Sequence, residues 1–161
     1  MAELSPSLNL DEYTQVGFAL ELLAQSDYHQ QYSVGDYFRT EILPPIWTNQ
    51  VRFYLTAEGV PTAMMTWAWL SQEVEQEMHQ TGRSLEQDEW QSGERLFFND
   101  WIAPYGNIRS VMHDIATNVF PDKTATSIRR NMDGSIRKIN YWTGITLRQQ
   151  REAKIRGQAN E

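Results

Sequence analysis

Residues 60–70 (VPTAMMTWAWL) form an almost unbroken apolar stretch, and this stretch constrains the fold more than any other segment. It follows a strand-like segment, residues 50–56, across a turn at Glu58-Gly59. A short apolar run beside a turn is typical of a strand that is covered on both faces of a sheet. The sequence therefore predicts a β-hairpin whose second strand lies centrally in a sheet.

The other segments predict helices around this sheet and further strands within it. Spacings of three and four between apolar residues, together with capping residues, favour helices at residues 11–26, 71–80 and 107–119. Further strands are predicted at residues 94–102, 124–131 and 135–143. A short helix around residues 34–43 is expected to end at Pro44-Pro45, since proline cannot continue a helix. The order indicates one α/β (α+β) domain with a mostly antiparallel central sheet flanked by helices.

Charge divides the chain into two unequal parts. Residues 1–107 hold 16 acidic and 4 basic residues, whereas residues 108–161 hold 5 acidic and 10 basic ones. Such an asymmetry can steer an acidic partner to one face, and it is equally typical of a solvated surface with a basic tail. Residues 1–146 are expected to form the domain. Residues 147–161 are expected to form a polar C-terminal tail that is mobile, or helical only against a partner.

Composition excludes several classes of protein and site. The net charge of −7 disfavours a nucleic-acid binder, and the lack of cysteine excludes disulfides, thiolate metal sites and a cysteine nucleophile. The phosphate-binding patterns GxxxxGK[ST] and GxGxxG are absent. Because there is no secretory signal at the N-terminus and no apolar run long enough to span a membrane, a soluble cytoplasmic protein is expected.

Two polar residues stand out as candidates for chemistry. His29 lies in SDYHQQY between two predicted helices, where it could act as a general base or cap the preceding helix. Asp100 interrupts the apolar strand LFFNDWIAP, where it could orient an imidazole or bond to backbone amides or to Arg95. The other histidines, His79 and His113, are expected on the surface, and the spacing of the three histidines predicts no metal site.

Several motifs resemble the RTX toxin-activating lysine acyltransferase family over roughly residues 20–143. The strongest is DEWQSGERLFFNDWIAPYG (residues 88–106), in which Asp100-Trp101-Ile102-Ala103-Pro104 is a specific pattern. The segment Trp67-Ala68-Trp69-Leu70-Ser71 and the placement of His29, three residues after Ser26, also match. The resemblance implies a fold similar to the acetyltransferase superfamily, that is, a GNAT-like acyltransferase fold.

The resemblance also implies an activity. Members take a fatty acyl chain from acyl carrier protein and attach it in amide linkage to internal lysines of an RTX protoxin in the cytoplasm. Acyl carrier protein is then a co-substrate, no cofactor is bound, and a homodimer is expected because members are often dimeric. The family's catalytic histidine and aspartate fall on His29 and Asp100, with His29 as general base or transient acyl acceptor and Asp100 orienting it.

Further site residues follow from the resemblance and from charge. Those expected to bind substrate are Ser26, Trp67, Trp69, Arg95, Phe98 and Trp101. The four aromatic residues among them could line an acyl channel or simply pack in the core. Since carrier proteins are acidic, the expected docking face is the basic last hairpin, at Arg129, Arg130, Arg137 and Lys138. The alternatives are acylation of another protein or amine, and a non-catalytic module that binds a partner.

Overall fold

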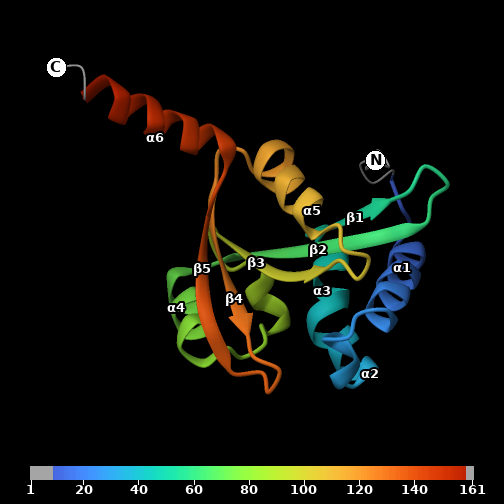
Figure 1. Cartoon of the computed structure of the whole chain (residues 1–161). Helices are drawn as coiled ribbons and strands as arrows, with labels where there is room; N and C mark the ends of the chain where they lie inside the picture. The colour runs from blue at the N-terminus through green and yellow to red at the C-terminus, as the bar shows by residue number, and fades with distance from the viewer. Residues whose placement is uncertain (1–8, 159–161) are drawn as a thin grey trace.

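A five-stranded sheet runs through the computed structural model, which describes residues 9–158 (Figure 1). In both spatial and sequence order its strands are β1 (Val51–Leu55), β2 (Pro61–Leu70), β3 (Arg95–Ile102), β4 (Thr124–Arg130) and β5 (Ile136–Thr143). Neighbours are antiparallel except β3 and β4, which are parallel. The predicted class is confirmed: one α/β domain with a mostly antiparallel sheet flanked by helices, consistent with an acyltransferase fold.

Helices cover both faces of the sheet. They are α1 (Glu12–Ala24), α2 (Val34–Tyr37), α3 (Leu43–Trp47), α4 (Gln72–Thr81), α5 (Ile108–Asp114) and α6 (Ile145–Gln158). Short 3₁₀ or π-helical turns lie between them: η1 (His29–Gln31), η2 (Phe38–Ile42), η3 (Gln87–Trp90) and η4 (Ile115–Val119). The side chains of Asp11 and Ser71 accept hydrogen bonds from free backbone amides and so fix where α1 and α4 begin.

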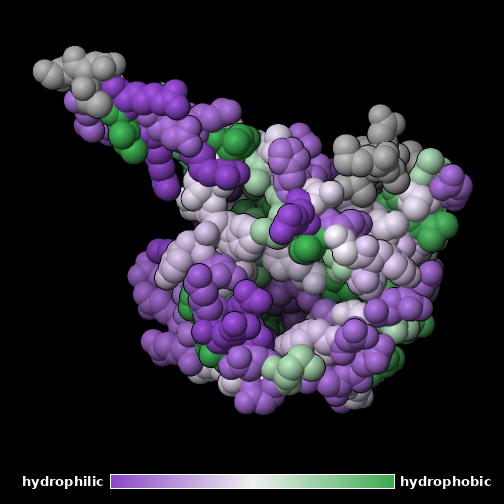
Figure 2. Space-filling model, in the orientation of Figure 1, coloured by the Kyte–Doolittle hydropathy of each residue, from purple (hydrophilic) through white to green (hydrophobic). Residues whose placement is uncertain are grey.

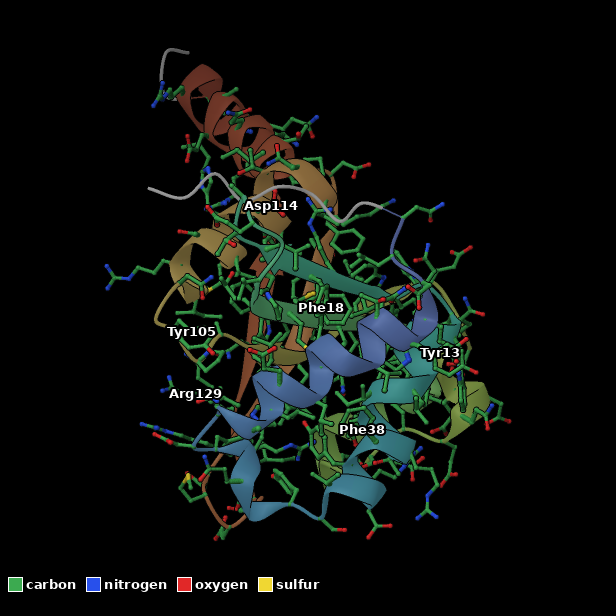
Figure 3. The ribbon with its side chains drawn as sticks, turned by 90° about the vertical axis from the view of Figure 1, so that its right-hand side faces the viewer. Tyr13, Phe18, Phe38, Tyr105, Asp114 and Arg129 are labelled. Carbon is green, nitrogen blue, oxygen red and sulfur yellow. The ribbon has the colours of Figure 1, made fainter. Side chains whose placement is uncertain are left out.

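The core has a layer on each face of the sheet. On one face, α1 and α3 pack over β1 and the start of β2, and α4 covers the end of β2. Phe18 of α1 lies between that helix and the strands, with its ring centroid 5.8 Å from that of Phe53 (Figure 3). On the other face, Val111 and Ile115 of α5 and η4 pack against β2 and β3. Alternation of side chains along β2 supplies both layers, because it is an interior strand.

We expected the helix to end at Pro44-Pro45, but the chain remains helical through both prolines. Both prolines lie in the first turn of α3, which directly follows the π-helical turn η2. Amides in the first turn of a helix have no partner within it, so the missing N–H of proline costs nothing there. The prediction was wrong because the rule that it applied holds for helix interiors.

A β-bulge in β3 decides which way Asp100 points. Thr66 of β2 pairs with Asp100, yet the next residue, Trp67, pairs with Phe98, so Asn99 is an extra residue in β3. In a regular strand Phe98 and Asp100 would share a face. With the bulge, Phe98 instead shares a face with Trp101, and their ring centroids lie 5.3 Å apart. Asp100 therefore points to the face that carries the N-terminal helices.

The parallel junction between β3 and β4 is short. Only Leu96–Phe98 pair with Ala125–Ser127, and beyond these residues the two strands separate. The bulge thus lies where the pairing stops, so the end of β3 borders a gap rather than a neighbouring strand. This separation makes room for a cleft next to Asp100.

The expected polar tail contains helix α6, which stands away from the sheet (Figure 1). None of its residues is buried, and its first turn lies against η4. Its mobility stays a prediction, and residues 159–161 lie outside the described part of the chain. Within residues 9–158, no helix is both long enough and apolar enough to cross a bilayer.

Candidate active site

A cleft of about 780 Å³ opens where β3 and β4 separate. Figure 2 shows it as a hollow near the middle of the face turned to the viewer. Its walls come from four parts of the chain: the segment from Gln25 to Glu41, Gly82 and Ser84 after α4, the end of β3 with the residues that follow it, and the end of β4 with the following turn. Residues that are far apart in the sequence therefore meet here.

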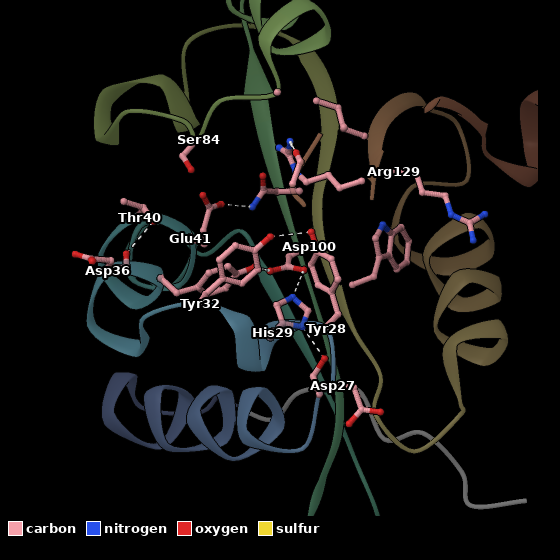
Figure 4. A pocket seen from close by; sticks show the side chains of 18 of the residues that line it. Asp27, Tyr28, His29, Tyr32, Asp36, Thr40, Glu41, Ser84, Asp100 and Arg129 are labelled. Atoms are coloured by element: carbon pink, nitrogen blue, oxygen red, sulfur yellow. Dashed lines mark hydrogen bonds and ion pairs between the residues drawn. The ribbon is translucent and has the colours of Figure 1, made fainter. Parts of the chain in front are cut away.

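His29 lies on the floor of this cleft and bonds through both ring nitrogens (Figure 4). Its Nε2 lies 3.0 Å from Oδ1 of Asp100, and its Nδ1 lies 2.6 Å from Oγ of Ser26. A carboxylate only accepts hydrogen bonds, so Nε2 carries the proton in the neutral ring and Nδ1 accepts from the Ser26 hydroxyl. The basic lone pair of His29 therefore points toward Ser26.

Tyr37 completes the surroundings of Asp100. Its hydroxyl donates to Oδ2 of Asp100, so both oxygens of this buried carboxylate are engaged. Burial raises the pKa of Tyr37 far above its ordinary value, and the Asp100 charge raises it further. Tyr37 thus remains a neutral donor. The rings of Tyr28 and Tyr37 also lie edge-on to the His29 ring, with centroids 5.0 and 5.4 Å away.

Glu41 is a second carboxylate in the cleft. It is half-buried and accepts a hydrogen bond of 2.8 Å from Nδ2 of Asn99, the bulge residue next to Asp100. Burial raises the pKa of Glu41, an effect that hydrogen bonds from Ser84 and Asn99 oppose. Sequence reasoning missed both Tyr37 and Glu41. The available signal was their spacing of four, which places two polar groups along one helical face after His29.

The structure brings together some of the predicted site residues and separates others. Ser26, His29 and Asp100 form one hydrogen-bonded set, and Trp101, Arg129 and Arg130 also border the cleft. Arg137 and Lys138 are exposed on β5, where Lys138 lies opposite Arg129. A role for these four basic residues in docking stays a prediction.

The aromatic residues predicted to line an acyl channel pack mainly on the opposite face of the sheet. Trp67 and Trp69 share a face, as alternation requires, and both contact Phe120, with ring centroids 5.3 and 6.0 Å apart. Phe98 packs in the same cluster. Of the four, Trp101 is the one that borders the cleft. Whether they hold an acyl chain stays a prediction.

Arg95 belongs to a second cavity, of about 590 Å³, at the other end of the β3–β4 junction. There it pairs with Glu75 at 3.0 Å rather than with Asp100. Thr126 donates to Glu75 at 2.9 Å and lies 3.1 Å from Nε2 of His79. The prediction that His79 is a surface residue is therefore wrong, because its ring is half-buried against β4, whereas His113 is exposed as predicted.

Comparison with known proteins agrees with the motifs. Residues 8–143, which include Ser26, His29 and Asp100, match the model of the RTX toxin acyltransferase family. The chain belongs to this family. The resemblance that the sequence motifs predicted is thus confirmed, and both the cleft and its hydrogen-bonded set fall within the matched region.

Several named relatives of this acyltransferase align along most of its length. A protein-lysine myristoyltransferase HlyC of Escherichia coli is 31% identical over 149 residues, covering 92% of this chain and 86% of the relative. The lysine-acyltransferase RtxC of Vibrio cholerae is 28% identical over 145 residues, covering 85% and 94%. An uncharacterized protein of Synechocystis is 30% identical over 129 residues, covering 80% and 87%.

Proposed function

We propose that this chain transfers a fatty acyl group from acyl carrier protein to internal lysine side chains of an RTX protoxin, in the cytoplasm. Two relatives are named for acyl transfer to lysine, and the chain belongs to their family. The observation that carries the proposal is the Ser26–His29–Asp100 set on the floor of a cleft. Such a set can take a proton from an amine and stabilise the resulting imidazolium.

The proposed reaction needs little beyond a base and good positioning. An acyl thioester is already activated, but a lysine ammonium must lose a proton before its nitrogen can attack. That proton passes to Nδ1 of His29, either directly or through the Ser26 hydroxyl. The new C–N bond forms as the C–S bond breaks, and the attacking nitrogen then gives up a second proton. His29 returns one of the two protons to the leaving thiolate, and the other passes to solvent. Asp100, held by Tyr37, keeps the ring oriented and stabilises its charged form.

Burial favours this role for His29 over transient acylation of its ring. Its side chain is only 4% exposed, and its Nδ1 is engaged by the hydroxyl of Ser26, a residue that is itself only partly buried. An acyl carbon would have to reach bonding distance of Nδ1, whereas a proton can be relayed by a hydroxyl. Direct transfer with His29 as general base is therefore the route that we favour.

The donor and the assembly are further parts of the proposal. Arg129 and Arg130 border the cleft, and Lys138 lies opposite Arg129 on β5, so an acidic carrier protein could dock beside the entrance. Arg137 extends the same basic hairpin. We also propose a homodimer, for which the chain offers exposed aromatic side chains, among them Tyr13 at 85% and Tyr141 at 79%.

The test is mass spectrometry of an RTX protoxin co-expressed with this chain. We expect a fatty acyl mass on lysine with the wild type, and none with His29→Ala. His113→Ala, which changes an exposed histidine, is the matched control and should acylate normally. Binding of the protoxin without any acylation by the wild type would instead indicate a non-catalytic module. Acyl groups found only on other proteins or on small amines would indicate a different substrate.

A further inference from the structure

The cleft contains one partly buried carboxylate that the proposed reaction does not use. Four carboxylates border it: Asp27, Asp36, Glu41 and Asp100. Asp100 is engaged by His29 and Tyr37, while Asp27 and Asp36 are exposed. Glu41 is half-buried, and no basic side chain within residues 9–158 forms an ion pair with it.

A partly buried carboxylate without a counter-ion is unfavourable on its own. Removing it from water weakens its hydration, and the two neutral groups at Glu41, the amide of Asn99 and the hydroxyl of Ser84, do not neutralise its charge. Burial accordingly raises the pKa of Glu41. A cationic ligand entering the cleft would supply the missing counter-charge.

The β-bulge places Glu41 beside the proposed base. Adjacent residues of β3 hold the two groups: Asn99 donates to Glu41, and Asp100 bonds to His29. Figure 4 shows both pairs in the same cleft, with tyrosine side chains between Glu41 and His29. A side chain with a terminal cation could therefore contact Glu41 before its nitrogen reaches His29.

We propose that Glu41 is the subsite that binds the ε-ammonium group of the lysine to be acylated. This inference rests on the proposed function, because lysine is the acceptor there. Glu41 holds the charged amine at the entrance to the His29–Asp100 pair, and the amine then moves on to His29, where its proton is lost. The residue selects an amine that carries a positive charge and excludes uncharged side chains of the same length.

Arg130 is the group that could compete with a lysine for Glu41. Its charge lowers the pKa of Glu41 from a distance, yet its guanidinium lies 3.5 Å from the carbonyl oxygen of Gly134 rather than on the carboxylate. The arginine therefore does not form an ion pair with Glu41, which borders the same cleft. Arg130 also borders the cleft.

The experiment compares two short peptides with glycine and serine flanks and blocked ends. One has a single central lysine, and the other has norleucine, which keeps the four-carbon chain but lacks the ammonium group. Binding is measured by NMR titration of the wild type, Glu41→Gln and Asp36→Asn. The glutamine keeps an acceptor oxygen for Asn99. Asp36→Asn removes one charge from the same rim, where Asp36 pairs with Arg39, and serves as the matched control.

We expect the wild type and Asp36→Asn to prefer the lysine peptide, and Glu41→Gln to bind it roughly tenfold more weakly, about 1.4 kcal/mol. Binding of the norleucine peptide should be the same in all three. In acylation assays, Glu41→Gln should raise KM for the lysine peptide while kcat changes less than about twofold. The proposed subsite would be overturned if the wild type did not prefer the lysine peptide, which includes the case in which it binds neither peptide. It would also be overturned if Glu41→Gln weakened the binding of both peptides equally.

His29→Ala separates this inference from the proposed function. It should bind the lysine peptide like the wild type, because Glu41 is unchanged, but should not acylate it. If the wild type never acylates lysine and yet shows a lysine preference that Glu41→Gln removes, the subsite stands and the proposed function fails. If acylation depends on His29 while Glu41→Gln keeps the full lysine preference, the proposed function stands and the subsite fails.

Discussion

The two cavities at opposite ends of the β3–β4 junction contain the same kinds of side chain, but these are hydrogen-bonded to one another in different orders. In the cleft, the ring of His29 bonds directly to the carboxylate of Asp100 and, through its other nitrogen, to a hydroxyl. In the second cavity, the hydroxyl of Thr126 stands between the ring of His79 and the carboxylate of Glu75. A protonated His29 is therefore stabilised by direct contact, whereas a protonated His79 would not be.

The counter-ions differ as well. Glu75 pairs with Arg95, so its charge is already compensated within the chain. Neither Asp100 nor Glu41 has an arginine or lysine ion pair among the described residues. A histidine, a hydroxyl and a carboxylate thus do not define an active site by themselves. What distinguishes the cleft is that the charges of Asp100 and Glu41 are left for His29 and for a ligand to balance.

The largest expected difference between the two cavities comes from replacing the histidine of each with alanine. His29→Ala should lower the rate of lysine acylation about 10³-fold, within the range that a general base contributes. His79→Ala should leave the rate within about twofold of the wild type. The rates are measured by mass spectrometry of the acylated lysine, with circular dichroism to confirm folding. Equal losses in the two variants would mean that the cavities do not differ in the way described.

A second comparison exchanges a carboxylate for an amide in each cavity. Asp100→Asn should lower the acylation rate about 10²-fold, because an amide neither stabilises an imidazolium nor enforces the Nε2–H tautomer. Glu75→Gln should not change the rate. Normal activity of Asp100→Asn would exclude the proposed role of Asp100.

The second cavity should instead contribute to stability. Glu75→Gln removes the ion pair to Arg95 and weakens the bond from Thr126, at a cost of about 1 kcal/mol in the free energy of unfolding. The loss is modest because the Arg95 side chain is half exposed and water can replace its partner. Urea unfolding measures it. A variant as stable as the wild type would mean that this network contributes nothing.

The smallest expected effect concerns Glu41 and pH. Burial raises the pKa of Glu41. Between the ordinary glutamate pKa and this raised value, the folded protein therefore binds more protons than the unfolded chain, and the free energy of unfolding falls as pH rises. Glu41→Gln should therefore be more stable than the wild type at about pH 7 and equally stable at about pH 3.5. Urea unfolding at both values tests this, and a gain that persists at low pH would contradict it.

Much of the fold could be predicted because its elements are encoded locally. The apolar run in β2, the turn before it and the capping residue Ser71 each set a boundary within a few residues. The same alternation placed Trp67 and Trp69 on one face. Alternation alone does not predict which face of the sheet lies beside His29, because this depends on how the helices pack on the folded sheet.

The candidate site could be predicted only in part. His29 and Asp100 were found through motifs and through the oddity of a charge in an apolar strand. Tyr37 and Glu41 were missed, because their roles depend on the π-helical turn η2 and on the bulge at Asn99, which bring distant segments together. Arg95 was one alternative partner for Asp100, yet the two lie on opposite sides of the bulge.

The short parallel junction has a mechanical consequence. Three residue pairs attach the β4–β5 leaf to the rest of the sheet, whereas seven pairs join β2 to β3. This is the shortest of the four strand pairings in the sheet. The width of the cleft therefore depends on Leu96–Phe98 and Ala125–Ser127, a pairing that ends next to the bulge at Asn99.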